Sequence, residues 1–126
     1  MASRIIVSVG PDDVLWEQVE ELPGCVREEL EGHEFGILRM DDDTGGLTAV
    51  VRYGPGFREP RQSHTFGHAV FVVRGAIFDA DSGKTLVPEG GYWYAPAGDV
   101  HGPFTFAPDT LVLFTTDGPR DFILEE

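Results

Sequence analysis

The chain has 126 residues, of which 41% are hydrophobic, and a formal net charge of −13 at pH 7. A chain of this length suits a single domain spanning residues 1–126, which buries about two-thirds of the surface that the unfolded chain exposes. The negative charge repels nucleic acid and anionic membranes, so we expect neither as a partner, and the single cysteine excludes a disulfide within the chain.

The N-terminal segment predicts a strand followed by a short helix. We expect the strand over residues 4–9. Pro11 and the two aspartates after it suit the first turn of a helix over residues 12–22, because proline fits there and carboxylates stabilise the positive end of the helix dipole. Pro23 and Gly24 would end this helix.

Two edge strands and an acidic turn follow. We expect the strands over residues 25–31 and 35–40, and the turn over residues 41–46. The adjacent aspartates of this turn lack the spacing and the terminal glutamate of an EF-hand, so we do not expect calcium there. We expect the acidic residues, and His33 in its Gly- and Glu-rich surroundings, to lie on the solvated surface.

The rest of the chain consists of short strands separated by turns. Residues 69–73 form an apolar run that predicts a strand buried on both faces. Residues 79–84 predict a hairpin turn, and residues 121–126 an edge strand or a frayed end. Further strands are expected over residues 47–53, 92–94 and 111–114. Many short strands punctuated by Gly, Pro and Asp predict an all-β sandwich or barrel.

Three of the four histidines fall between residues 60 and 105. Gln62 and His64 are two residues apart, so on an extended strand their side chains face the same side. His68 follows Gly67, which can adopt the positive φ of a tight bend. His101 comes just after a Pro-Ala-Gly turn and would approach from a neighbouring strand. The pattern predicts a site for one divalent metal formed by Gln62, His64, His68 and His101.

The first part of this stretch, about residues 56–75, resembles the first motif of the cupin superfamily. Gly56, His64 and Gly75 occupy motif positions. Gln62 stands where the motif has its first histidine, and His68 stands where it has a glutamate. The resemblance implies that these two residues also face the metal.

The second part, about residues 90–105, resembles the second cupin motif more closely. The matching residues are Gly90, Pro96, Gly98 and His101, with Thr105 where asparagine is usual. The lead-in over residues 43–56 resembles small bacterial ChrR-like cupins and cupins similar to acetylacetone or dihydroxyacetophenone dioxygenases. The implied fold is all-β, a cupin double-stranded β-helix (jelly-roll barrel) with a short N-terminal helical segment.

Three imidazoles without a carboxylate would leave a bound transition metal its full formal charge and make it a stronger Lewis acid. The resemblance implies a three-histidine iron centre, so Fe(II) is the favoured cofactor, with Zn, Mn and Ni open. It also implies a dioxygenase that cleaves a small oxygenated substrate such as a diketone or aryl ketone. Gln62 is either a fourth ligand or a polar neighbour. An apolar pocket around the metal would be lined by Phe66, Phe71, Tyr94, Phe104 and Phe106, together with Met40 and Arg52.

Three other functions stay open. The chain could be a non-redox isomerase, lyase or cyclase that uses Zn, Mn or Ni, and such an enzyme would work without oxygen. It could be a non-catalytic cupin that senses a metal or ligand. It could also be a structural cupin without metal, in which His64 and His68 satisfy each other.

The expected partners are a small-molecule substrate and a second copy of the chain. In small cupins an N-terminal strand often adds to a partner's sheet, so residues 4–9 suit a homodimer element. We find no signal peptide and no apolar run of about 18 residues or more, which makes the cytoplasm the expected location.

Overall fold

A computed structural model describes residues 8–125. Within this range the chain is almost entirely β, with short 3₁₀ helices at Pro11–Asp13 and Arg27–Leu30 and no α-helix. The strands are β1 (Glu17–Gln18), β2 (Glu34–Met40), β3 (Leu47–Arg52), β4 (Gln62–Ser63), β5 (His68–Arg74), β6 (Ile77–Asp79), β7 (Thr85–Val87), β8 (Tyr92–Ala95), β9 (Phe104–Phe106), β10 (Leu111–Thr116) and β11 (Ile123–Leu124). The all-β prediction is confirmed.

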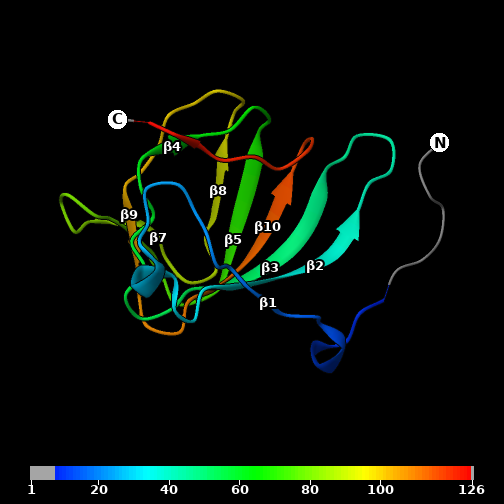
Figure 1. The fold of residues 1–126 in the computed structure, drawn as a ribbon, viewed down its shortest axis with the longest axis horizontal. Coiled ribbons are helices and arrows are strands. Elements are labelled where there is room, and N and C mark those ends of the chain that lie inside the picture. The colour runs from blue at the N-terminus through cyan, green and yellow to red at the C-terminus, as the bar shows by residue number, and fades with distance from the viewer. Residues whose placement is uncertain (1–7, 126) are drawn as a thin grey trace.

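The strands form two layers. The larger sheet has the order β1-β2-β3-β10-β5-β8, and every neighbouring pair is antiparallel. The opposite layer contains the sheet β7-β6-β9 and the pair β11-β4. In Figure 1 the long strands from β8 to β2 lie side by side, and β4, β7 and β9 lie toward one side of them. This arrangement is the jelly-roll barrel that the sequence predicts.

Two backbone bridges join the pieces of the smaller layer. Glu59 pairs with Phe104 through two hydrogen bonds of 2.9 Å, and Gln62 pairs with His101 through bonds of 2.8 and 2.9 Å. On its other side Gln62 is paired with Leu124 of β11. The segment around Gln62 therefore lies between the chain that carries His101 and the C-terminal strand.

The main core lies between the two layers. Its buried members are Val70, Val72, Ile77, Val87, Phe104 and Val112. In β5 the side chains alternate, so Val70 and Val72 point inward while Phe71 is 41% exposed and Val73 is 47% exposed. The prediction of a strand buried on both faces is wrong, because nothing among the described residues covers the outer face at these two side chains.

The predicted helix over residues 12–22 is also wrong. After the 3₁₀ turn at Pro11–Asp13 the chain becomes extended, and β1 pairs with the edge of β2. Val19 donates a backbone hydrogen bond of 2.8 Å to His33. Val14 packs so closely on Gly36 that a Cβ there would lie 2.4 Å from Val14 Cγ1. The local sequence favours a helix only weakly, and pairing with the sheet edge and packing on it outweigh that preference.

The expected edge strand over residues 25–31 is absent, and a 3₁₀ helix at Arg27–Leu30 takes its place. The helix Arg27–Leu30 starts at Val26, whose N–H donates to the Glu29 carboxylate at 3.0 Å, and it buries Leu30. The expected strand at residues 4–9 lies largely outside the described residues, and Ser8 and Val9 have no regular structure. Among the described residues no helix has the length and apolar character needed to cross a membrane.

Candidate metal centre

The fold brings His64, His68 and His101 together from three separate segments. His64 follows β4, His68 begins β5, and His101 lies between β8 and β9. Their potential ligand nitrogens all lie within 4.8 Å of one another. The imidazole centroids of His64 and His68 are 4.2 Å apart, and each of the two lies 5.2 Å from that of His101.

Backbone carbonyls orient two of the three imidazoles. His64 Nδ1 lies 2.5 Å from the Asp121 carbonyl oxygen, and His101 Nδ1 lies 3.0 Å from the Asp99 carbonyl oxygen. A carbonyl can only accept, so each Nδ1 carries the proton and each neutral ring keeps a lone pair on Nε2. Metal-binding histidines are commonly held this way, through the ring nitrogen that does not touch the metal.

Two imidazole nitrogens of this cluster, His68 Nδ1 and His101 Nε2, are buried without a hydrogen-bond partner among the described residues. A buried polar atom that is left unpaired costs free energy, so such atoms in a native protein require a ligand, an ion or water. Their position in the histidine cluster fits a bound cation.

The environment favours the neutral forms of His68 and His101. Burial, followed by the nearby charges of His64 and His101, lowers the pKa of His68 from 6.5 to about 3. Burial is also the largest cause of the lowered pKa of His101, and the hydrogen bond to Asp99 partly opposes it. Neutral imidazole is the form that binds metals. The residues present therefore fit a divalent transition metal with nitrogen ligands.

Gln62 lies in the same cavity and is only 1% exposed. Its amide nitrogen donates to Glu59 Oε1 at 2.5 Å and to the Pro60 carbonyl at 3.0 Å. The amide oxygen is then the atom left to approach a metal or a bound water. Its role as a fourth ligand stays a prediction.

Glu59 is a cavity residue that sequence reasoning missed. Burial raises the pKa of its carboxyl group to about 7, against the opposing effects of the Gln62 hydrogen bond and the Arg120 charge. No motif position marks Glu59. Its backbone pairing with Phe104 turns it toward the cavity, and that pairing is a long-range contact that the local sequence does not reveal.

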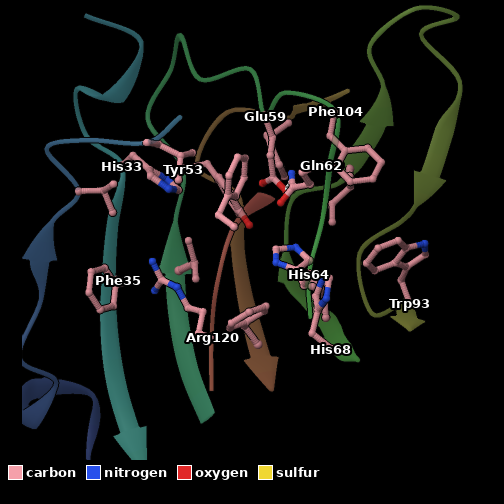
Figure 2. A pocket seen from close by; sticks show the side chains of 18 of the residues that line it. His33, Phe35, Tyr53, Glu59, Gln62, His64, His68, Trp93, Phe104 and Arg120 are labelled. Carbon is pink, nitrogen blue, oxygen red and sulfur yellow. Dashed lines mark hydrogen bonds between the residues drawn. The ribbon is translucent and has the colours of Figure 1, made fainter. Parts of the chain in front are cut away.

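The cavity extends from the histidines between the two sheets and has a volume of about 110 Å³. Figure 2 shows His64, His68 and Trp93 toward one side and His33 and Phe35 toward the other. Phe104 and Phe106 line it, as expected. The other apolar lining residues include Val51, Val70, Ile77, Trp93, Phe114 and Phe122.

Several predicted lining residues lie elsewhere. Phe66, Phe71 and Tyr94 are 41%, 41% and 47% exposed and do not line this cavity. The Phe71 side chain points to the outer face of the larger sheet, opposite to Val70 and Val72. Met40 is 54% exposed, and Arg52 instead pairs with Glu34 at 3.3 Å. Phe66 lies in the loop between β4 and β5. The other four residues lie on strands, where alternation and the register of pairing set which side chains face inward.

His33 is buried, contrary to the prediction that it lies on the surface. It is 7% exposed, stacks on Phe57 with ring centroids 4.2 Å apart, and lies 5.2 Å from the Tyr53 ring. Burial lowers its pKa to about 4. The polar residues around His33 in the sequence suggested a surface position. Its burial could not be predicted, because Tyr53 and Phe57 come from a distant part of the chain.

The C-terminal segment is tied to the loop that carries His64 and His68. Asp121 accepts hydrogen bonds from the backbone and the hydroxyl of Thr65, and Asp117 accepts one from the Tyr94 hydroxyl at 2.7 Å. Gly67 does not have the positive φ that we expected. It is needed for space, since a Cβ there would lie 2.2 Å from the Tyr94 hydroxyl oxygen.

Comparison with known proteins identifies the family. The family model described as the ChrR cupin-like domain matches residues 9–121. The chain therefore belongs to the ChrR cupin-like family, and the cupin resemblance noted in its motifs is confirmed.

One curated protein and two solved structures illustrate the range of relatives. The chain is 35% identical over 82 residues to the Arabidopsis thaliana DNA damage-repair/toleration protein DRT102, covering 63% of this chain but 26% of that protein. It thus spans about a quarter of the length of this curated relative.

The solved structures share the fold at low identity. A candidate acetylacetone dioxygenase from Methylibium petroleiphilum has 19% identity and a TM-score of 0.70, over 100% of this chain and 85% of that chain. A chain from the crystal structures of the DMSP lyases RdDddP and RnDddQII has 20% identity and a TM-score of 0.70, over 90% of this chain and 63% of that one. The same fold therefore serves proteins described by different reactions.

Proposed function

We propose that the chain binds one divalent transition metal through His64, His68 and His101 and acts as a metal-dependent dioxygenase on a small oxygenated substrate. The observation that carries this proposal is the convergence of three imidazoles, two of them with unpaired buried nitrogens, beside an apolar cavity that His64 and His68 line. Bound Fe(II) would supply the redox chemistry with dioxygen, while the cavity would hold a diketone or aryl ketone beside it.

The protein's own residues would position the metal and limit water access. The carbonyls of Asp121 and Asp99 hold His64 and His101 by their outer nitrogens. Trp93, Phe104 and Phe114 pack near the histidines and offer apolar contacts to a substrate. Because the cluster contains no carboxylate, the metal would keep its positive charge and favour an anionic, oxygen-rich substrate. The structural likeness to a candidate acetylacetone dioxygenase supports this assignment.

The second candidate is a metal-dependent lyase or related non-redox enzyme. The structural likeness to DMSP lyases favours it. Such an enzyme would use Zn, Mn or Ni as a Lewis acid and would need no dioxygen. Turnover under anaerobic conditions separates the two candidates.

The metal content of protein purified without an affinity tag or added metal tests the site. We expect about one equivalent of a transition metal in the native chain and none in the His64→Ala/His101→Ala variant. A native chain that is metal-free, and that takes up no iron, manganese, nickel or zinc when these are supplied, would show that the enzyme proposal is wrong.

The identity of the metal then selects the activity assay. With iron, we expect dioxygen consumption in the presence of β-diketones or aryl ketones, lost in each single histidine variant. Turnover that continues without dioxygen would instead support the lyase candidate. Retained metal and retained turnover in every single histidine variant would contradict both.

A further inference from the structure

Arg120 is held at the mouth of the cavity by the backbone on both sides of it. Before it, the Asp117 N–H donates to the Gly67 carbonyl at 2.9 Å and the Asp117 carboxylate accepts from Tyr94. After it, Asp121 is bonded to Thr65 through both its carboxylate oxygens. The segment is also packed tightly, since a Cβ on Gly118 would lie 2.5 Å from the Phe66 ring. The backbone of Arg120 is therefore fixed in place.

The guanidinium group of Arg120, in contrast, has no hydrogen-bond or ion-pair partner among the residues that the structure describes. It lies over the Phe35 ring, 4.9 Å from the guanidinium carbon to the ring centroid. Arg120 lines the cavity together with His64 and His68. In Figure 2 its side chain lies between Phe35 and these two histidines.

The two acidic residues that share the cavity with Arg120 are already engaged. The Glu59 carboxylate accepts the Gln62 amide, and the Asp121 carboxylate accepts Thr65. Neither lies within ion-pair distance of Arg120 in the described structure, although other arginines do pair, as Arg52 does with Glu34. Although the chain has 22 acidic and only 9 basic residues, the Arg120 guanidinium in the lining of the cavity is thus unpaired among the described residues.

We propose that Arg120 binds an anionic group, a carboxylate, on the substrate. The substrate class is then a small carboxylic acid whose other, oxygen-bearing end reaches the histidine cluster. This substrate assignment rests on the proposed function. A guanidinium matches a carboxylate by two parallel hydrogen bonds, and the fixed backbone lowers the ordering cost of binding.

The apolar wall between the two ends gives the substrate its expected form. Val51, Val70 and Phe114 line the cavity, so the middle of the ligand would be hydrocarbon or aromatic. Arg120 would then fix the orientation of the substrate at the metal. It is a specificity residue and takes no part in proton transfer.

Benzoate is a suitable probe because it joins a carboxylate to an aromatic ring, and benzamide is its neutral counterpart of similar shape. Both would be titrated into metal-free protein and followed by chemical-shift changes in ¹H–¹⁵N spectra, which also report whether each variant is folded. The test variant is Arg120→Gln. The matched control is Arg39→Gln, which removes an exposed arginine that pairs with Asp41 at 3.7 Å, away from the cavity.

We expect wild type and Arg39→Gln to bind benzoate more tightly than benzamide. In Arg120→Gln we expect benzoate to bind about tenfold more weakly, as the loss of one charge-assisted pair predicts, with benzamide unchanged. Arg120→Lys should retain part of the preference. Equal benzoate affinity in wild type and Arg120→Gln, or no preference for benzoate over benzamide, would overturn the proposal.

The result can be separated from that of the metal test. A His64→Ala/His101→Ala variant that still prefers benzoate through Arg120 shows that the carboxylate binds the arginine and not a metal. A native chain without metal that keeps this preference would contradict the enzyme proposal and leave the anion site standing. A metal-loaded chain that does not prefer benzoate over benzamide would contradict the anion site and leave the metal site standing.

Discussion

The four histidines lie in two different surroundings, and His33 lines the same cavity as His64 and His68. His64, His68 and His101 face one another, and two of them are held by carbonyl groups. His33 instead stacks on Phe57 beside Tyr53, and its buried Nδ1 has no partner among the described residues. The first arrangement suits metal binding, whereas the second makes His33 a packing residue whose protonation the fold resists.

The buried His33 should make the protein sensitive to acid. Its pKa is about 4 in the folded state and about 6.5 in an unfolded chain. Between these values the unfolded chain binds a proton that the folded chain does not, so stability is fully present above pH 6.5 and falls as the pH drops toward 4. The loss reaches at most about 3 kcal/mol from this residue.

The His33→Phe variant tests this prediction because phenylalanine keeps a stacked ring and removes the titration. We expect stability close to wild type at about pH 8 and a smaller loss between about pH 6.5 and 4.5, measured by urea unfolding of metal-free protein. Part of the acid sensitivity should remain, because His68 and His101 also have lowered pKa values. An unchanged loss in the variant would show that His33 is not its source.

At the scale of elements, the loop before β5 is positioned by contact with the C-terminal segment. Gly67 is buried at this contact, with the Tyr94 hydroxyl and the Asp117 carboxylate directly above its Cα hydrogen. The same segment supplies the carbonyl that orients His64. The pairing of β11 with β4 is short, but it belongs to the segment that positions His64.

Gly67→Ala should destabilise the protein by about 1–3 kcal/mol, because the new methyl group would overlap the Tyr94 hydroxyl. Gly56→Ala is the matched control: Gly56 also lacks a positive φ, and no atom lies within 4 Å of the place that its methyl group would take. We expect it to change stability by less than about 0.5 kcal/mol. Urea unfolding measures both.

Adding Tyr94→Phe to Gly67→Ala should restore part of the loss, since it removes the overlapping oxygen. If Gly67→Ala were as stable as Gly56→Ala, the close approach of the loop and the C-terminal segment would be wrong.

At the scale of the whole molecule, charge is the dominant property. The excess of 22 acidic over 9 basic residues gives −13, and most of these groups lie on the surface, where their repulsion acts against the folded state. The few ion pairs in the described residues, such as Arg39 with Asp41, are partly exposed and stabilise little.

Salt should therefore stabilise this protein. We expect the urea midpoint at pH 7 to rise between about 0.02 and 0.5 M NaCl, because the range of the repulsion shrinks from roughly 20 Å to roughly 4 Å. A variant with Glu20→Gln, Glu21→Gln and Asp42→Asn should show a smaller rise, since all three carboxyl groups are exposed. A midpoint that falls with salt in wild type would contradict this account.

The single domain over residues 1–126, the homodimer and the cytoplasmic location stay predictions.

The sequence by itself determined the fold class, the position of most of the strands and which three histidines lie together. Apolar runs broken by Gly, Pro and Asp predict short strands whichever partner strands they pair with. The histidine pattern of the two motifs depends only on local spacing and turns. Gly75, Gly90 and Gly98 indeed adopt positive φ values of 92°, 78° and 78°.

Only the tertiary structure decided which side chains face the cavity. His33, Glu59 and Arg120 carry no local signal, because each reaches the cavity through a contact with a distant segment or through sheet register. Pairing with a distant strand also explains why residues 12–22 do not form the predicted helix, since β1 pairs with the edge of the sheet instead. Sheet register likewise places Phe71 and Tyr94 outside the cavity. Spacing along the chain fixes local geometry, whereas burial and the choice of hydrogen-bond partner are settled only when the two layers meet.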